Sequence, residues 1–125
     1  MPYSVEYLEE PGVVETVYAG ALSTAEFNAA VVATADTAAG LLCTRFLSDC
    51  RELEVGEHSP TLDIWALAEF LAQLPQGTFE REALLLPAAA AAGEDIRFYE
   101  TACRNRGLDV RVFSERDEAL AWLAT

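Results

Sequence analysis

The sequence contains no lysine. All eight of its basic residues are arginines, against 21 aspartates and glutamates, and the formal net charge is −13 at pH 7. The absence of lysine excludes a Schiff-base lysine and the phosphate-binding G-x-x-x-x-G-K loop. Because so acidic a surface repels nucleic-acid phosphates and anionic lipid headgroups, we expect no nucleic acid among the partners. Five arginines between Arg97 and Arg116 leave open a local docking patch, although solvated helix faces explain them more simply.

Histidine, cysteine and long apolar runs are also scarce. Histidine occurs once, at His58, and the three cysteines, Cys43, Cys50 and Cys103, have no C-x-x-C spacing. This odd, unclustered set argues against a disulfide framework or a zinc site and suits a reducing compartment. No apolar run reaches the roughly 18 residues of a membrane span, and the first residues carry no basic signal-peptide pattern. We therefore expect a cytoplasmic protein with no membrane span, no bound metal and no cofactor.

The length and the apolar content fit one globular unit. The chain has 125 residues, of which 52% are hydrophobic, so residues 1–125 can form a single domain around one core. A core of this size needs no metal or disulfide to hold it together.

The first half of the sequence predicts a hairpin followed by a helix. Residues 3–7 alternate apolar and polar side chains, a turn follows at residues 9–12, and residues 13–19 are rich in β-branched and aromatic side chains. Ser23 and Glu26 have the spacing of a capping box, which predicts a helix from Thr24 to Ala39 that stops at Gly40.

The second half predicts three strands that alternate with three helices. We expect strands at 44–48, 82–86 and 109–113, and helices at 59–74, 94–106 and, after a cap at 114–117, the C-terminus. The acidic stretch from Asp49 to His58 and the alanine run from Ala88 to Ala92 are expected to be loops. The resulting order is β-β-α-β-α-β-α-β-α, which predicts an α/β fold with a mainly parallel, mixed five-stranded sheet and four helices.

This order, together with three C-terminal segments, resembles the STAS-like, SpoIIAA-like family over essentially the whole chain. The segments are FYETACRNRG (98–107), VRVF (110–113) and EALAWL (118–123), and Asp49-x-Arg51 is similar to the strand end D-x-R of that family. The resemblance implies a small regulatory or binding domain and not an enzyme. Members of the wider fold act as anti-sigma-factor antagonists or transporter appendages, and some resemble lipid-carrying modules.

The sequence departs from this family at the segment that carries the phosphorylation switch. Phospho-regulated antagonists have a hydroxyl residue directly after an aspartate at the start of the second helix, whereas Cys50 follows Asp49 here. Ser59 and Thr61 are the nearest hydroxyls at a helix start and are the candidate phosphoacceptors. An N-cap role explains Ser59 more simply, because the hydroxyl of a cap stabilises a helix by about 1 kcal/mol.

Cys50 and His58 are the candidate nucleophile and base of a thiol enzyme. A reactive thiol needs a nearby cation or helix N-terminus, but the acidic neighbours of Cys50 are expected to raise its pKa. A metal site at His58 with Glu54 and Glu57 lacks a second imidazole or thiolate at ligand spacing. We expect Asp49 to accept hydrogen bonds from Arg51 or from loop amides.

The second predicted helix has a wider apolar surface than one sheet contact requires. Its apolar residues either contact a partner or second copy of the chain, border an apolar cavity, or are simply buried. Phe70 follows Asp63 by seven residues and so shares its exposed face, whereas Trp65 is expected to face the core.

Two classes of function remain open from the sequence, beside the less favoured thiol enzyme. The first is a non-catalytic interaction domain that docks a protein (a kinase, an anti-sigma factor or a transporter), through a face that includes Asp49, Arg51, Ser59, Thr61 and Phe70, with a homodimer as a further option. The second is a carrier of a small apolar ligand or lipid.

Overall fold

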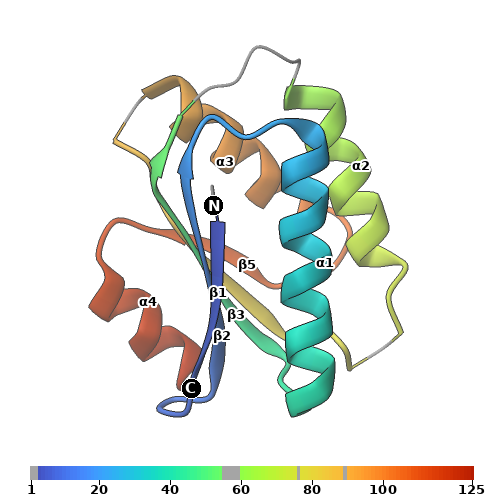
Figure 1. The fold of residues 1–125 in the computed structure, drawn as a ribbon, viewed down its shortest axis with the longest axis vertical. Coiled ribbons are helices and arrows are strands. Elements are labelled where there is room, and N and C mark those ends of the chain that lie inside the picture. Colours follow the sequence, from blue (N-terminus) through green and yellow to red (C-terminus); the bar gives the residue numbers. More distant parts are fainter. Residues whose placement is uncertain (1–2, 55–59, 76, 89) are drawn as a thin grey trace.

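The computed structural model describes residues 3–54, 60–75, 77–88 and 90–125. Within these ranges, the chain forms five strands and four helices in the order predicted from the sequence (Figure 1). The strands are β1 (Tyr3–Leu8), β2 (Val13–Gly20), β3 (Arg45–Leu53), β4 (Arg81–Leu85) and β5 (Val110–Phe113). The helices are α1 (Thr24–Leu41), α2 (Pro60–Ala72), α3 (Ala90–Arg104) and α4 (Arg116–Leu123).

The strands form one mixed sheet whose spatial order follows the sequence. β1 lies at one edge, antiparallel to β2, and β2, β3, β4 and β5 run parallel to one another. The hairpin accounts for the antiparallel edge, because a short turn can only reverse the chain. The α/β class and the mixed sheet are therefore as predicted.

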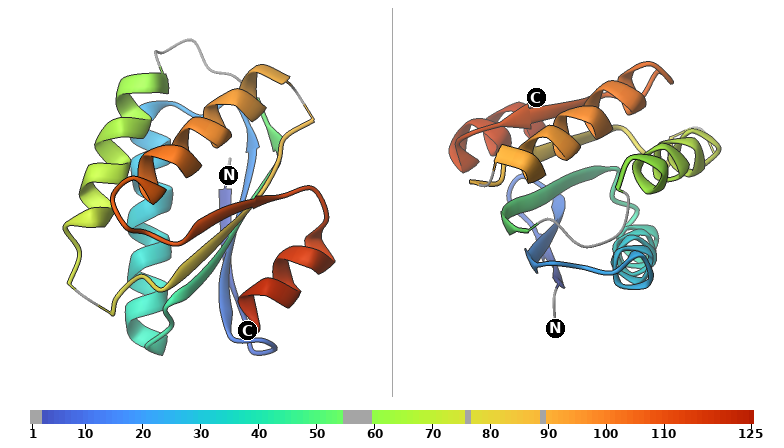
Figure 2. Two further views of the ribbon diagram at one scale, coloured as in Figure 1. Left: turned by 180° about the vertical axis from the view of Figure 1, so that it is seen from behind. Right: turned by 90° about the horizontal axis from the view of Figure 1, so that it is seen from above.

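The helices are divided unequally between the two faces of the sheet (Figure 2). On one face, α4 alone packs its Ala119 and Leu123 against Val13, Leu47 and other buried residues of β2, β3 and β4. On the other face lie α1, α2 and α3, around a larger core in which Tyr99 of α3 belongs to the same cluster as strand residues. These two faces are called the α4 face and the three-helix face below.

The first helix begins as predicted but ends later. Ser23 accepts a hydrogen bond from the backbone N–H of Glu26, and the Glu26 carboxylate accepts one from the backbone N–H of Ser23, which completes the capping box. The helix continues through Gly40, and Leu42 closes it in the left-handed conformation at φ 53°. The N–H of Leu42 donates to the carbonyl of Ala39 and that of Cys43 to the carbonyl of Ala38, so the stop is formed two residues beyond the glycine.

The prediction of a loop after Ser48 is wrong, because β3 continues to Leu53. Asp49, Cys50 and Arg51 therefore belong to a strand. β3 is central in the sheet and pairs with β2 as far as Gly20 and Leu53. These ladder hydrogen bonds outweigh the low strand propensity of the acidic residues.

Two smaller boundaries also differ from the prediction. α3 begins at Ala90, inside the alanine run predicted to be a loop, which fits the high helix propensity of alanine. Glu115 is the N-cap of α4, and its side chain makes no capping hydrogen bond.

Candidate functional site

Alternation along β3 decides which side chains face the three helices. Phe46, Ser48 and Cys50 are two residues apart and point to the three-helix face. The register then shifts, because Val17 pairs with Asp49 but Ala19 pairs with Glu52. The extra residue in β3 is a bulge-like irregularity, and it places Leu53 on the same face as Cys50.

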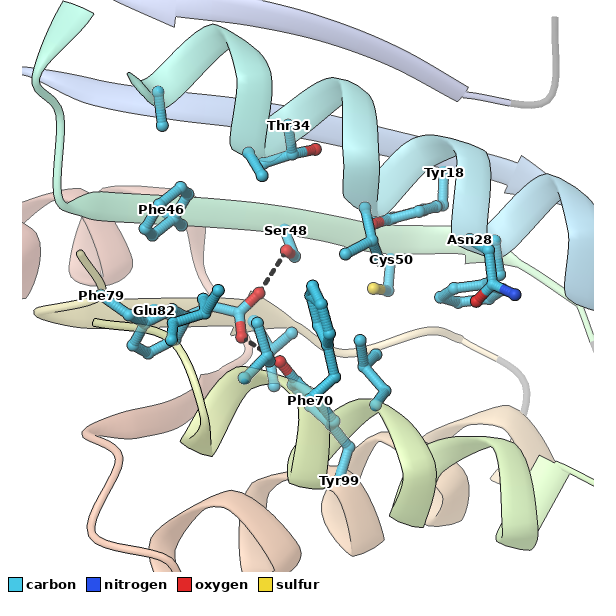
Figure 3. Close-up of a pocket in the computed structure, with 18 of the residues that line it drawn as sticks. Tyr18, Asn28, Thr34, Phe46, Ser48, Cys50, Phe70, Phe79, Glu82 and Tyr99 are labelled. Carbon is cyan, nitrogen blue, oxygen red and sulfur yellow. Dashed lines mark hydrogen bonds between the residues drawn. The ribbon is translucent and has the colours of Figure 1, made fainter. Parts of the chain in front are cut away.

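These side chains form the floor of a cavity of about 580 Å³ on the three-helix face (Figure 3). A volume in this range is typical of pockets that hold small organic ligands. The walls are mostly apolar. They include Phe27, Val31 and Ala35 of α1, Leu67, Phe70 and Leu71 of α2, Leu74 just after α2, Phe79 before β4, Leu84 of β4 and Ile96 of α3.

The cavity exists because the helices on this face pack on different neighbours. α1 packs mainly on β1 and β2, whereas α2 packs mainly on α3. The side of α1 that lines the cavity carries short side chains, among them Thr34, Ala35 and Ala38, which do not fill the space toward α2. The width of the apolar surface on α2 therefore has an explanation in the structure: part of it borders a cavity, which was one of the alternatives open from the sequence.

A hydrogen-bonded trio of polar side chains lies in the floor of this cavity. Glu82 of β4 is buried, and its two carboxyl oxygens accept from different donors: Ser48 Oγ at 2.7 Å and the Tyr99 hydroxyl at 2.6 Å (Figure 3). Burial raises the pKa of Glu82, and the two hydrogen bonds oppose this rise only in part. Among the residues that the structure describes, the carboxyl group has no cation as a hydrogen-bond partner.

The thiol of Cys50 lies in the same floor and is buried. Burial raises its pKa well above the ordinary range, and the negative charges of Glu82 and Asp49 raise it further. The prediction that acidic surroundings raise this pKa is confirmed, although burial is the larger cause. Burial likewise raises the pKa of Tyr18 and of Tyr99, so both phenols keep their protons.

Asp49 and Arg51 form an ion pair on the other side of the sheet from this trio. The Arg51 guanidinium donates to both carboxylate oxygens of Asp49, at 3.0 and 2.8 Å, and the backbone N–H of Arg51 adds a third bond at 3.1 Å. Burial acts to raise the pKa of Asp49, but these bonds and the charges of Arg51 and Arg116 lower it overall. The predicted hydrogen bonding of Asp49 by Arg51 is therefore confirmed.

Of the predicted site residues that the structure describes, Asp49 and Arg51 do not lie together with Phe70. Phe70 is 49% exposed and lines the cavity, on the three-helix face, whereas Asp49 and Arg51 lie toward the α4 face. Thr61 lies within α2, while Glu57, His58 and Ser59 fall outside the described residues, so the predicted cap and the predicted base have no structural account.

The prediction that Trp65 faces the core is wrong, because its side chain is 54% exposed. Its ring lies under the guanidinium of Arg106, in the turn that follows α3, 4.7 Å from the ring centre. Arg106 also forms an ion pair with Glu69 at 2.6 Å. The cation–π contact and the packing of α2 on α3 explain why an exposed tryptophan is tolerated here.

The arginines of the C-terminal part do not form one free basic patch. Arg106 pairs with Glu69, Arg111 with Asp109, and Arg116 with Glu15 of β2 at 3.0 Å. Each of these three cations is therefore next to a carboxylate, which favours the simpler interpretation of the arginine-rich region.

Sequence reasoning missed the trio of Ser48, Glu82 and Tyr99. A signal was present: Ser48 and Glu82 are polar residues at the ends of two strands that were predicted to belong to a mainly parallel sheet. Buried strands of this kind rarely carry an unpaired polar side chain, so a partner across the sheet could have been sought.

A comparison with solved structures finds a protein of similar architecture. The chain superimposes on the crystal structure of an uncharacterized protein of the DUF3478 family from Shewanella loihica PV-4, described as having a SpoIIAA-like fold. The TM-score is 0.63 over 97% of this chain and 91% of the other, at 18% sequence identity. This chain has a SpoIIAA-like fold. The fold named from the C-terminal segments and the element order is thus confirmed.

Comparisons of the sequence with known proteins do not suggest an activity for this chain. No protein-family model matches the chain, and no curated protein matches it significantly. Among the described residues, no helix combines the length and the apolar character needed to cross a membrane. In the same residues, no group of three or more His, Cys, Asp or Glu side chains is placed to hold a metal ion.

Proposed function

We propose that residues 1–125 form a single, non-catalytic binding domain of SpoIIAA-like fold that holds a small apolar ligand. The observation that carries this proposal is the cavity of about 580 Å³ between α1, α2 and the sheet, with its mostly apolar walls. Burial of the apolar surface of the ligand is the main favourable contribution to the free energy of binding at such a site, at roughly 25 cal/mol per Å².

The chemistry of the cavity supports binding over catalysis. Its thiol, Cys50, is held protonated by burial, and a thiol in this state is a poor nucleophile. The remaining polar groups of the floor, Ser48, Glu82 and Tyr99, are bonded to one another. The unbonded cysteines also favour a reducing location, which we propose to be the cytoplasm.

A pair of tryptophan substitutions on α1 tests the proposal. Ala35 lines the cavity, whereas Ala29 is exposed on the same helix and does not. We expect the purified protein to bind the neutral dye Nile red with a rise in fluorescence, and Ala35→Trp to weaken this binding at least tenfold because the indole fills the space. Ala29→Trp, the matched control, is expected to bind as the parent does.

The same proteins can be examined by native mass spectrometry for a ligand that co-purifies. A bound small molecule in the parent and in Ala29→Trp, but not in Ala35→Trp, is the expected result. If the parent neither binds the dye nor carries a ligand, the proposal of a ligand-binding cavity is wrong.

The second candidate function is a regulatory domain that docks a protein partner through α2 and α3. The specific observation in its favour is a pair of exposed aromatic side chains, Trp65 and Phe98, which border one shallow surface hollow with Arg106. Aromatic residues and arginine are enriched at the centres of protein interfaces. A kinase, an anti-sigma factor or a transporter segment would be the type of partner that the fold suggests.

A phosphorylation assay distinguishes the regulatory function from the ligand-binding function. Incubation with cell lysate and ATP should add the mass of a phosphate to Ser59 or Thr61 if the domain is a phosphorylation switch, and the double variant Ser59→Ala with Thr61→Ala should stay unmodified. An unchanged mass in the parent would remove the switch. Trp65→Gln would then show whether a partner still requires the α2–α3 surface.

A further inference from the structure

The side chain of Glu82 in the cavity floor is stable as a neutral carboxyl group. It is buried, and burial favours the protonated form more than the two hydrogen bonds favour the ionised form. Within the described part of the chain, its hydrogen-bond partners are hydroxyl groups and not cations. A protonated carboxyl group needs no counter-ion, and it also carries a hydrogen that it can donate.

The trio of Ser48, Glu82 and Tyr99 then holds one O–H donor more than its own contacts use. Each of the three side chains carries one O–H hydrogen. Two O···O contacts join them, at 2.7 Å between Ser48 and one carboxyl oxygen and at 2.6 Å between Tyr99 and the other. Each contact uses one hydrogen, so one hydrogen remains to be donated outside the trio. The thiol of Cys103, beside the Tyr99 hydroxyl, is only a weak acceptor.

The spare donor is available to a molecule in the cavity, because all three members of the trio line it. They come from three elements, β3, β4 and α3, so the trio forms one polar spot among mostly apolar walls (Figure 3). A buried donor without an acceptor is unfavourable. An oxygen atom of the ligand that accepts this hydrogen would therefore add to the affinity and fix the direction of the ligand.

The other titratable groups near the trio leave this count unchanged. Those of the described lining are Tyr18, Cys43, Cys50, Glu54 and Asp95. Burial raises the pKa of Tyr18, of Cys50 and of Cys103, the last to about 12, so these groups stay protonated. The Cys43 thiol donates to backbone carbonyls. Glu54 is exposed and Asp95 is partly buried, whereas Glu82 is buried.

We propose that the ligand of the cavity is an uncharged amphiphile, an apolar chain ending in a carbonyl or hydroxyl oxygen, and that this oxygen accepts a hydrogen bond from the trio. This inference rests on the proposed ligand-binding function and narrows it to a chemical class. A charged head fits less well, because it would lose its water against mostly apolar walls. An ammonium head would also have to ionise Glu82, so that two charges lose their hydration.

Four probes with the same chain length and different heads test the class. They are methyl nonyl ketone, undecanol, undecanoic acid and undecylamine, each used below its aggregation limit to displace Nile red from the purified protein at neutral pH. We expect the ketone and the alcohol to displace the dye at a concentration at least tenfold lower than the two charged probes. Equal or tighter binding of either charged probe would overturn the assignment and leave the cavity proposal intact.

Three substitutions of glutamate by glutamine locate the donor. When Glu82 ionises at higher pH, the trio loses its spare hydrogen, and the ketone, which can only accept, should bind at least fivefold more weakly. Glu82→Gln keeps N–H donors at every pH and should abolish this pH dependence. Glu54→Gln, in the lining, and Glu118→Gln, exposed on α4 on the opposite face, should keep the pH profile of the parent. A ketone affinity that does not change with pH in the parent, or that changes equally in Glu82→Gln, would contradict the proposal.

The infrared C=O stretch of an isotopically labelled ketone gives a direct readout of the hydrogen bond. We expect the frequency of the bound ketone at mildly acid pH to lie below its value in an alkane solvent, and the lowering to be smaller in Glu82→Gln, since an amide N–H is a weaker donor. An alkane-like frequency, or the same frequency in both proteins, would overturn the bond to the trio. Failure of the dye and of all four probes would instead contradict the ligand-binding function itself.

Discussion

Two buried carboxyl groups, Asp49 on β3 and Glu82 on β4, lie on neighbouring strands of one sheet and have opposite pKa shifts. Asp49 is held by the guanidinium and the backbone N–H of Arg51, and its pKa is lowered despite burial. Within the described part of the chain, Glu82 is hydrogen-bonded by the hydroxyls of Ser48 and Tyr99, and burial raises its pKa. The difference shows that the α4 face pairs its acid with a guanidinium, whereas the described residues of the three-helix face bind their acid through hydroxyl groups.

The packing of side chains also differs between the two faces: it is tight on the α4 face and leaves a cavity on the three-helix face. On the α4 face, Val13, Leu47, Leu85 and Leu123 are fully buried against one another. Polar contacts hold both ends of α4, with Arg116 bound to Glu15 at one end and the carbonyls of Trp122 and Leu123 bound by arginines at the other. The three-helix face instead encloses a cavity. We infer that the α4 face stabilises the fold, while the three-helix face is available to a ligand.

Replacing one buried leucine by alanine on each face should give the largest difference between variants in the free energy of unfolding. Leu47 is fully buried on the α4 face, whereas Leu84 borders the cavity. We expect Leu47→Ala to lower the free energy of unfolding by about 3 kcal/mol, and Leu84→Ala by at least ~1 kcal/mol less, because part of its surroundings is already empty. Urea denaturation midpoints and slopes measure both. Equal losses would indicate that the cavity is filled by side chains in solution.

The pH dependence of stability should have opposite signs for the two acids. The pKa of Glu82 is raised in the folded state, so its contribution is present at low pH and is lost as the pH rises through the folded pKa. The pKa of Asp49 is lowered, so its contribution is present above the unfolded pKa and is lost as the pH falls. With rising pH, Glu82→Gln should therefore gain stability relative to the parent, and Asp49→Asn should lose it.

Denaturation curves from mildly acid to mildly alkaline pH test these two slopes. The Glu118→Gln variant, which changes an exposed acid, serves as the control for the general effect of one charge. Parallel pH profiles for the parent and Glu82→Gln would show that the carboxyl group of Glu82 is solvated.

Two aromatic residues of α2 should give the smallest effects on stability. Trp65 and Phe70 are both about half exposed, so Trp65→Gln and Phe70→Gln are each expected to cost less than about 1 kcal/mol. Only Phe70 lines the cavity, and its substitution should weaken Nile red binding several-fold while Trp65→Gln leaves it unchanged. The opposite order of effects on dye binding would place the ligand on the α2–α3 surface.

The sequence predicted the element order because local signals were strong. The capping box at Ser23 and Glu26 formed as expected, and the strands were marked by apolar residues between turn signals. The end of β3 was misjudged, because its last residues owe their conformation to pairing with β2 and not to their own propensity.

The candidate site was harder to predict than the fold. Trp65 was assigned to the core because apolar periodicity on α2 does not reveal which apolar residues meet α3 and which border solvent. The trio at Glu82 depends on the register of β3 and β4 and on the placement of α3, both of which are set by tertiary packing. Periodicity in one segment carries no information on these distances.

The separate attachment of α1 and α2 has a kinetic consequence. Because α1 rests mainly on β1 and β2 while α2 rests mainly on α3, the gap between the two helices can widen without breaking any hydrogen bond of the sheet. We expect exchange of the proposed ligand to require displacement of these helices, a kind of motion that takes place in microseconds to milliseconds, and not unfolding. For the proposed ligand, we therefore expect loading and release to be fast compared with unfolding of the sheet.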